Sequence, residues 1–319
     1  MPTVRAVSLA WVESPLQLVG AVEFSAATGA RMTIIPRDTG PQMASTAREI
    51  VRRGLPDGVL LAAKARDIPW SQLRRHRGWL LGDALSGQAR LALARLRPEQ
   101  VVLVDDGAMT LRLADAFSGR AKFARPNVTE GPTMRLLGRM ARSVLRSAQT
   151  TLFTYHHRAL PPLAAFRRAG GMVEANSFTW VRRAGSAIRM PQSRVLLGTA
   201  RVVDGLMTGD AHLGWVRAQA AAGPVVYLPH RRETDLDRVA AVPGVEVVQT
   251  GLPVELALAG TDKPLEIVSL PSSAVDTLRI VLAGTGSTVS EVGASAGSTS
   301  GVGGVSAGST SGVGLGATP

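Results

Sequence analysis

One uninterrupted apolar run, residues 101–104, constrains the fold of this chain more than any other stretch. Four branched apolar residues without polar alternation predict a strand buried on both faces, as in a parallel sheet covered by helices. Asp105, Asp106 and Gly107 follow at once. Ligands of open α/β sheets bind beyond the carboxyl ends of the strands, so the two acids stand where chemistry is expected. A turn in which Asp105 caps the next helix is the alternative interpretation.

Strand and helix patterns alternate around this run. Ser14 followed by Pro15 is a typical helix start, with Ser14 as the N-cap. Strands are predicted at residues 4–12, 31–36, 59–61, 79–83, 101–104 and 150–155, and helices at residues 14–24, 43–53, 85–96 and 133–149. This alternation predicts a doubly wound parallel sheet.

The alternation breaks near residues 184–192 and then restarts, which predicts a second α/β domain. We expect residues 1–188 to form the first Rossmann-like domain and residues 189–284 the second, with the active site in the cleft that they face. Residues 285–319 consist largely of Gly, Ser, Thr, Ala and Val, and residues 295–303 recur as residues 306–314. Such a segment buries too little apolar surface to offset its ordering entropy, so a disordered tail is predicted.

The chain is strongly basic. The 319 residues hold 36 Lys and Arg against 24 Asp and Glu, for a net charge of +12. This excess favours anionic partners. Cysteine is absent, which excludes disulfides, a thiol nucleophile and a cysteine metal site. Neither a signal peptide nor an apolar run of about 20 residues is recognisable, so a cytoplasmic location is expected.

Three motifs stand at predicted strand ends in this order: Asp105-Asp106-Gly107, the segment 229–233 around His230, and Ser272-Ser273. The ordered set resembles the bacterial sialyltransferases and polysialyltransferases of glycosyltransferase families 52 and 38. Ser14-Pro15-Leu16-Gln17 after the first strand is also similar. In one respect the chain departs from the family, whose histidine is usually followed by proline, because here Pro229 precedes His230 and Arg231 follows it.

The resemblance implies a GT-B fold and a particular reaction. It implies that sialic acid or a related nonulosonic acid moves, with inversion, from a CMP-linked donor to an acidic cell-surface glycan. Neither a metal nor a cofactor is expected beyond the nucleotide sugar. Transfer passes through an oxocarbenium-like state and expels a phosphate, so the site needs a base for the acceptor hydroxyl and donors for the leaving group.

Candidate residues follow from this chemistry and from the resemblance. Asp105 or Asp106 is the expected base, with Asp204 as a rival. His230 is expected to supply a proton or positive charge to the leaving phosphate, and Ser272 and Ser273 to donate from a helix N-terminus. The resemblance also implies that Glu255 binds the ribose. The further candidates for substrate binding are Gly107, Gly198, Thr199, Arg231, Ser14 and Gln17.

Several of these residues have a plainer interpretation. His230 could be a structural residue that caps a loop, Ser272-Ser273 a simple N-cap, and Glu255 a favourable charge at a helix start. The pair His156-His157 lacks a third ligand at helical spacing, so no metal site is predicted. Two other functions stay open, namely a GT-B transferase with another nucleotide sugar and a non-catalytic, basic polyanion-binding protein. Nucleic acid is not an expected partner, because the chain has no recognisable binding module and only 4% aromatic residues.

The predicted helix at residues 133–149 is strongly amphipathic. Arg135, Arg139, Arg142 and Arg146 share one stripe, and the opposite face holds Leu137, Met140, Ala141, Val144 and Ala148. Like charges in a row favour an anionic partner, either the acidic acceptor or the inner face of the cell membrane as a peripheral contact. A simply solvated face is the alternative.

Overall fold

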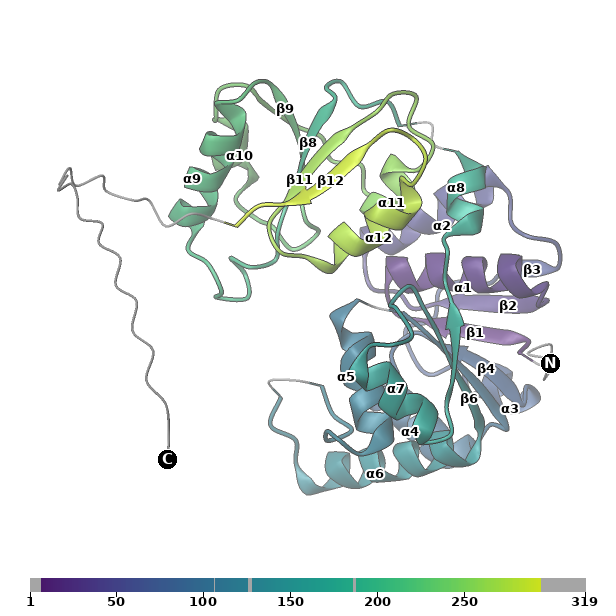
Figure 1. Cartoon of the computed structure of the whole chain (residues 1–319). Coiled ribbons are helices and arrows are strands. Elements are labelled where there is room, and N and C mark those ends of the chain that lie inside the picture. Colours follow the sequence, from purple (N-terminus) through teal and green to yellow (C-terminus); the bar gives the residue numbers. More distant parts are fainter. Residues whose placement is uncertain (1–6, 106, 126–127, 186–187, 294–319) are drawn as a thin grey trace, which may run out of the picture.

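The computed structural model describes residues 7–105, 107–125, 128–185 and 188–293. These residues form two α/β units, each built on a wholly parallel sheet (Figure 1). The two Rossmann-like domains predicted from the sequence are confirmed.

The first sheet has seven strands in the order β3-β2-β1-β4-β5-β6-β7. The chain runs outward from β1 to β3 and then resumes on the other side of β1 at β4. This reversal creates a switch point, where the carboxyl ends of an α/β sheet leave a crevice for a ligand. The strands are β1 (Leu9–Val12), β2 (Met32–Pro36), β3 (Val59–Leu61), β4 (Gly78–Leu81), β5 (Gln100–Val104), β6 (Gln149–Thr154) and β7 (Met172–Ala175).

Strand β5 is buried on both faces, as the apolar run predicted. Val102 and Val104 belong to the hydrophobic cluster on one side of the sheet, and Val101 and Leu103 to the cluster on the other side. Helices therefore cover both faces. They are α1 (Pro15–Thr28), α2 (Pro41–Arg53), α3 (Trp70–Arg75), α4 (Gly87–Leu96), α5 (Ala108–Ser118), α6 (Pro132–Ser147), α7 (Pro161–Arg168) and α8 (Thr179–Ala184).

The second sheet has five strands in the order β10-β9-β8-β11-β12, with its own switch point between β8 and β11. Its strands are β8 (Arg194–Leu197), β9 (Val225–Leu228), β10 (Val245–Val247), β11 (Glu266–Ser269) and β12 (Thr288–Glu291). The helices beside it are α9 (Gly209–Ala220), α10 (Leu236–Ala240), α11 (Val254–Leu258) and α12 (Ser273–Val281).

Strand β12 corrects one prediction. It lies within the segment expected to be disordered from residue 285, yet it pairs in parallel with β11, with Val289 opposite Ile267. Without β12, β11 would be the edge of the sheet and would leave its backbone hydrogen-bonding groups unpaired. The four residues of β12, with the sequence Thr-Val-Ser-Glu, suffice to cover that edge, although their composition resembles that of the tail. The rest of the predicted tail, residues 294–319, lies outside the described residues.

Polar contacts hold α8 against α1 within the first unit and link that unit to the second. The carboxylate of Glu23 on α1 accepts hydrogen bonds from the backbone N–H groups of Trp180 (3.0 Å) and Val181 (2.7 Å) at the start of α8. Burial raises the pKa of Glu23, and these backbone donors oppose the rise. Arg53 donates to the carbonyl oxygen of Leu256 in the second unit at 2.7 Å. Of these contacts, the one from Arg53 to Leu256 spans the two units.

Helix lengths and apolar character also bear on membrane insertion. Within the described ranges, none of the helices combines the length and the apolar character that a membrane span requires.

Candidate active site between the two domains

A cavity of about 330 Å³ lies between the carboxyl ends of the two sheets. Segments that follow β1, β5, β9 and β11 meet there, so it stands beside the switch points of both sheets. From the first domain it is lined by residues that include Ser14, Gln42 and Gly107, and from the second by residues that include His230, Arg231, Glu255, Ser272 and Ser273. The structure thus brings together residues from all three strand-end motifs.

Ser272 and Ser273 form the start of α12. Ser272 is the N-cap, and its Oγ accepts a hydrogen bond from the backbone N–H of Ala274 at 3.3 Å. Both serines are exposed at the cavity. A helix N-terminus presents unpaired N–H groups and a partial positive charge, so this end of α12 suits an anionic group. Capping and anion binding are compatible roles here.

His230 stands in the loop that follows β9. Its Nδ1 accepts a hydrogen bond from the backbone N–H of Arg232 at 3.2 Å. The neutral ring therefore carries its proton on Nε2, where it can donate to a ligand oxygen. Burial, together with the charges of Arg231 and Arg232, lowers the pKa of His230, while Asp204 opposes this shift.

Glu233 organises this loop, a role that the sequence did not reveal. Its side chain is 8% exposed. The carboxylate accepts hydrogen bonds from the backbone N–H of His230 (2.9 Å), the backbone N–H of Thr199 (2.8 Å) and the hydroxyl of Tyr227 (2.7 Å). Burial raises the pKa of Glu233, and the three donors oppose the rise. The only sequence signal was an acid three residues after the histidine.

Gly198 and Thr199 lie behind the His230 loop, and neither lines the cavity. A β-carbon on Gly198 would lie 2.8 Å from Cα of Pro229 and would also collide with the backbone nitrogen of His230. Their contact with substrate was a prediction that the geometry does not favour. They instead allow the loop to pack closely against the end of β8.

Asp105 is buried and fully engaged. It is 5% exposed and accepts hydrogen bonds from the backbone N–H of Gly107 (2.8 Å), from Thr110 Oγ1 (2.7 Å) and from Thr154 Oγ1. Burial raises the pKa of Asp105, while these hydrogen bonds and the nearby His156 oppose the rise. The carboxylate therefore holds the turn between β5 and α5. Asp106, the other candidate base, lies outside the described residues.

Asp204, the rival base, does not line the cavity. Its Oδ1 forms an ion pair with Arg232 at 2.6 Å, and its side chain is 39% exposed. The chain also contains one Asp-x-Asp sequence, from Asp235 to Asp237, of the kind used to bind metal ions. Asp235 pairs with Arg238 (3.3 Å) beside α10, outside the cavity. In the part of the chain that the structure describes, no group of three or more His, Asp or Glu side chains is placed to hold a metal ion.

Glu255 stands in the first turn of α11 and lines the cavity. It is 4% exposed, and one carboxylate oxygen accepts a hydrogen bond from Thr277 Oγ1 at 2.5 Å. Burial raises the pKa of Glu255, and the Thr277 hydrogen bond opposes the rise. A carboxylate oxygen at the cavity wall is a suitable acceptor for a ligand hydroxyl.

Ser14 and Gln17 form the predicted start of α1. Ser14 is the N-cap, and Gln17 Oε1 accepts hydrogen bonds from the backbone N–H groups of Glu13 (2.8 Å) and Ser14 (3.0 Å). Gln17 is 1% exposed, so its amide oxygen is used to fix the turn after β1. Ser14 lines the cavity, and both residues line a second hollow beside it.

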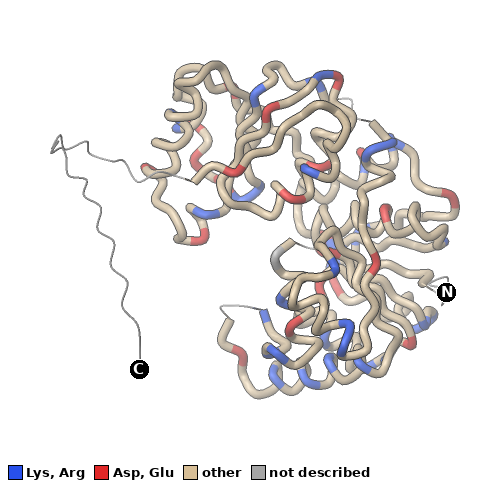
Figure 2. The backbone as a smooth tube through the Cα atoms, in the orientation of Figure 1, with Lys and Arg blue, Asp and Glu red and all other residues tan. Residues whose placement is uncertain are grey.

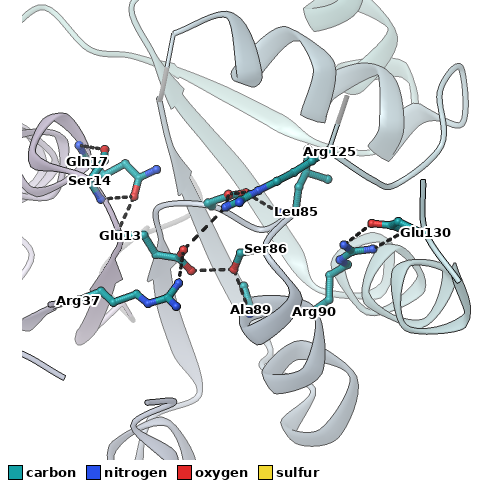
Figure 3. Close-up of polar contacts among 11 residues, drawn as sticks. Glu13, Ser14, Gln17, Arg37, Leu85, Ser86, Ala89, Arg90, Arg125 and Glu130 are labelled. Atoms are coloured by element: carbon teal, nitrogen blue, oxygen red, sulfur yellow. Dashed lines mark hydrogen bonds and ion pairs between the residues drawn. The ribbon is translucent and has the colours of Figure 1, made fainter. Parts of the chain in front are cut away.

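This second hollow, of about 620 Å³, is strongly polar. We call it the charged basin; it is lined by Glu13, Ser14, Gln17, Arg37, Asp38, Thr39, Asp83, Arg125, Arg231 and Arg232. Figure 3 shows Glu13 between Arg37 (2.8 Å) and the hydroxyl of Ser86 (2.7 Å). Ser14 and Arg231 line both the basin and the cavity, so the two spaces adjoin.

The arginine stripe of α6 is only partly exposed. Arg135, Arg139 and Arg146 are exposed, but Arg142 is half-buried and donates to the carbonyl oxygen of Phe117 at 3.1 Å. Figure 2 shows Lys and Arg positions along α6, at the edge of the first domain that faces away from the second. Met140, expected on the apolar face, is 37% exposed, because Gly138, Ala141 and Leu145 form the buried face.

No family model and no curated protein matches this chain. Solved structures do match it. An α/β-galactoside α-2,3-sialyltransferase from the luminous marine bacterium Photobacterium phosphoreum is similar over 89% of both chains, with 12% identity and a TM-score of 0.50. The chain has a GT-B-like fold. At this identity the likeness concerns the fold alone, and it confirms the fold that the sequence predicted.

Two further structures are similar at lower TM-scores. LpCGTa in complex with UDP is similar over 86% of this GT-B-like chain and 83% of its own, with 13% identity and a TM-score of 0.47. A UDP-glucose:anthocyanidin 3-O-glucosyltransferase in complex with UDP is similar over 85% of this chain and 78% of its own, with 13% identity and a TM-score of 0.44.

Proposed function

We propose that this protein is a metal-independent, inverting glycosyltransferase that moves sialic acid or a related nonulosonic acid from a CMP donor to an acidic cell-surface glycan. The observation that carries the proposal is the single cavity in which His230, Glu255, Ser272 and Ser273 of one domain face Gly107 of the other. The GT-B-like fold supports a transferase that uses a nucleotide sugar.

The donor occupies the second-domain side of the cavity. The phosphate of CMP accepts hydrogen bonds from Ser272, Ser273 and the N-terminus of α12, where an anion is favoured. The ribose hydroxyls donate to Glu255. A cavity of about 330 Å³ has the scale of a small-molecule site.

The reaction exchanges one bond for another at the anomeric carbon. The bond from this carbon to the phosphate oxygen breaks, and an acceptor oxygen forms a new bond on the opposite face of the sugar. His230 donates from Nε2 toward the leaving phosphate, where negative charge grows. The acceptor hydroxyl loses its proton to a carboxylate on the first-domain side.

We assign that carboxylate to Asp106. The support is the state of Asp105, whose two oxygens already accept hydrogen bonds from Gly107, Thr110 and Thr154. A carboxylate engaged in this way holds the backbone, which leaves the other member of the pair for proton transfer. Asp204 is the weaker candidate, because Arg232 neutralises it outside the cavity.

The acceptor occupies the charged basin beside the donor. The carboxylates that line the basin accept hydrogen bonds from the sugar hydroxyls of the acceptor. Arg231 binds an anionic group of the glycan. Arg231 makes no ion pair with any residue in the described ranges, and it lines both spaces. It is therefore placed to contact the acceptor next to the bond that forms.

A nucleotide-binding experiment tests the donor assignment. Calorimetric titration with CMP, UDP and GDP is expected to show binding of CMP, weakened about 10-fold or more when Ser272→Ala and Ser273→Ala are combined. Ser143→Ala with Ser147→Ala on the outer surface of α6 is the matched control and should leave CMP binding unchanged. Preferential binding of UDP or GDP would favour another nucleotide sugar. Binding of a polyanion without any nucleotide would favour the non-catalytic alternative.

We also propose a cytoplasmic location with peripheral contact at the inner face of the cell membrane. Exposed Arg135, Arg139 and Arg146 stand beside exposed Leu136 and Met140 on α6, a combination that suits an anionic bilayer surface. Changing the three arginines to glutamine should weaken sedimentation with phosphatidylglycerol vesicles. Arg158→Gln, Arg167→Gln and Arg168→Gln together provide a control with the same loss of charge. Equal sedimentation of both variants would indicate a solvated face.

A further inference from the structure

We infer that Glu233 is a positioning residue for His230 and that it sets where the imidazole stands relative to the leaving phosphate. The inference rests on the proposed role of His230 in transfer. It assigns a function to a carboxylate that makes no contact with substrate in that proposal and acts through the backbone of the catalytic loop.

The contacts of Glu233 hold the end of β8 to β9 and to the loop that follows β9. Oε2 accepts a hydrogen bond from the backbone N–H of His230, and Oε1 accepts from the backbone N–H of Thr199 and the hydroxyl of Tyr227. Thr199 follows β8, while Tyr227 is on β9 itself. The two strands pair with each other in the interior of the second sheet, so Glu233 ties the His230 loop to that sheet.

The same side of the loop is also held by close packing. Gly198 lies against Glu233 Oε2, Pro229 and the backbone nitrogen of His230, with no room between them for a β-carbon. The packing at Gly198 and the hydrogen bonds of Glu233 therefore both hold the loop against the end of β8. Removing the tie frees the backbone of His230 while the packing at Gly198 remains.

A carboxyl group suits this position better than an amide, because the three groups that hydrogen-bond to it all donate. Two of the donors are backbone N–H groups, which cannot reverse their role. The Tyr227 hydroxyl gives its proton to Glu233 and stands 3.1 Å from His212 Nε2, which can donate to it in turn. A glutamine would turn an NH₂ group toward at least one backbone N–H and leave that donor unpaired.

The charged groups near His230 separate this role from an electrostatic one. Arg231 and Arg232 lower the pKa of His230 and Asp204 raises it, whereas Glu233 contacts only its backbone nitrogen. Glu233 should therefore affect turnover through the position of the ring. Donor binding at Ser272, Ser273 and Glu255 should not depend on it, because these residues belong to α11 and α12.

The test is a double-mutant cycle measured as CMP release from CMP-N-acetylneuraminic acid by the full chain. Glu233→Gln is expected to lower kcat about 10-fold or more, the scale of a misplaced catalytic group, with the donor KM changed less than about 2-fold. His230→Ala combined with Glu233→Gln should be no slower than His230→Ala alone. Glu246→Gln, an exposed change on β10 of the same domain, is the matched control and should leave kcat unchanged. Tyr227→Phe removes one donor without changing charge and should lower kcat several-fold, also without a change in KM; it serves as the test if Glu233→Gln does not fold.

The outcomes distinguish the two proposals. Normal kcat in Glu233→Gln, or in Tyr227→Phe where that variant is used, together with an inactive His230→Ala would overturn the positioning role and leave the proposed function standing. A double variant slower than His230→Ala by the full factor of Glu233→Gln would also overturn it, because Glu233 would then act independently of His230. Normal turnover in His230→Ala would overturn the proposed function and the positioning role together.

Discussion

Gly107 of the first domain faces Ser273 of the second so closely that a β-carbon on Gly107 would lie 2.7 Å from the Ser273 hydroxyl oxygen. Gly107 follows β5, and Ser273 begins the helix after β11. Gly107 has φ of 69° and ψ of −133°, a backbone conformation that residues with a side chain rarely adopt. Glycine is thus required here both by the backbone and by the approach of the two domains.

Gly107→Ala should therefore impair turnover as well as stability. The backbone strain should lower the free energy of unfolding by about 1–3 kcal/mol, and the new methyl group should push Ser273 away and slow CMP release about 10-fold or more. Gly170→Ala is the control, because Gly170 also has a positive φ (96°) but has no atom near its missing β-carbon. Equal activity of the two variants, measured beside their melting temperatures, would contradict this account of the Gly107–Ser273 contact.

Asp105→Asn and Asp106→Asn should have different effects. Asparagine at position 105 would turn an NH₂ group toward groups that now donate hydrogen bonds to the carboxylate. The free energy of unfolding should fall by about 1–3 kcal/mol as a result. Asp106→Asn should abolish transfer without lowering the melting temperature. Denaturant unfolding and CMP release, measured on both variants, check this contrast. An Asp105→Asn protein as stable as the wild type would refute the structural role of Asp105.

Two truncations test the correction at β12. Ending the chain after Gly293 keeps every described residue and should leave the melting temperature unchanged. Ending it after Ala283 removes β12 and exposes the edge of β11, so the melting temperature should fall by several degrees. Calorimetric scans of the two chains give the comparison directly. If the two chains have the same melting temperature, β12 does not contribute to the stability of the second domain.

Stability should depend on pH through Glu255. Because burial raises the pKa of Glu255 above its ordinary value of 4.5, the folded state holds this proton more tightly than the unfolded state does. The wild type should therefore lose stability as the pH rises from about 4.5 through the raised pKa, and the neutral Glu255→Gln variant should lack that part of the loss. Urea unfolding at pH 4.5 and pH 8 measures the difference, with the exposed Glu246→Gln as control. If the wild type and Glu255→Gln differ in free energy of unfolding by the same amount at both pH values, Glu255 does not contribute to the pH dependence of stability.

The sequence was most informative where one pattern has one physical cause. Strand–helix alternation predicted both parallel sheets, because a strand buried on both faces needs helices on each side. The strand-end motifs predicted residues that meet in one cavity, since the carboxyl ends of parallel strands share one edge. Strand β12 was missed because four edge residues within a Gly- and Ser-rich segment carry too little pattern.

The uses of individual polar side chains were harder to predict. Asp105 was grouped with Asp106, yet Thr110 and Thr154 engage it, and Thr154 comes from the neighbouring strand β6. Glu233 belongs to the predicted motif at residues 229–233, but its partners Thr199 and Tyr227 become neighbours only when β8 and β9 pair. Hydrogen bonds between distant segments decide these roles, and such contacts leave no local signal in the sequence.

The release of CMP from CMP-N-acetylneuraminic acid by the purified protein, compared between the wild type and His230→Ala, tests the proposed transfer. We expect turnover by the wild type, a loss of about 100-fold or more in His230→Ala, and unchanged CMP affinity in that variant. Turnover of a UDP-linked sugar in place of the CMP donor, or equal CMP release by both proteins, would refute transfer from a CMP donor with His230 as the catalytic group.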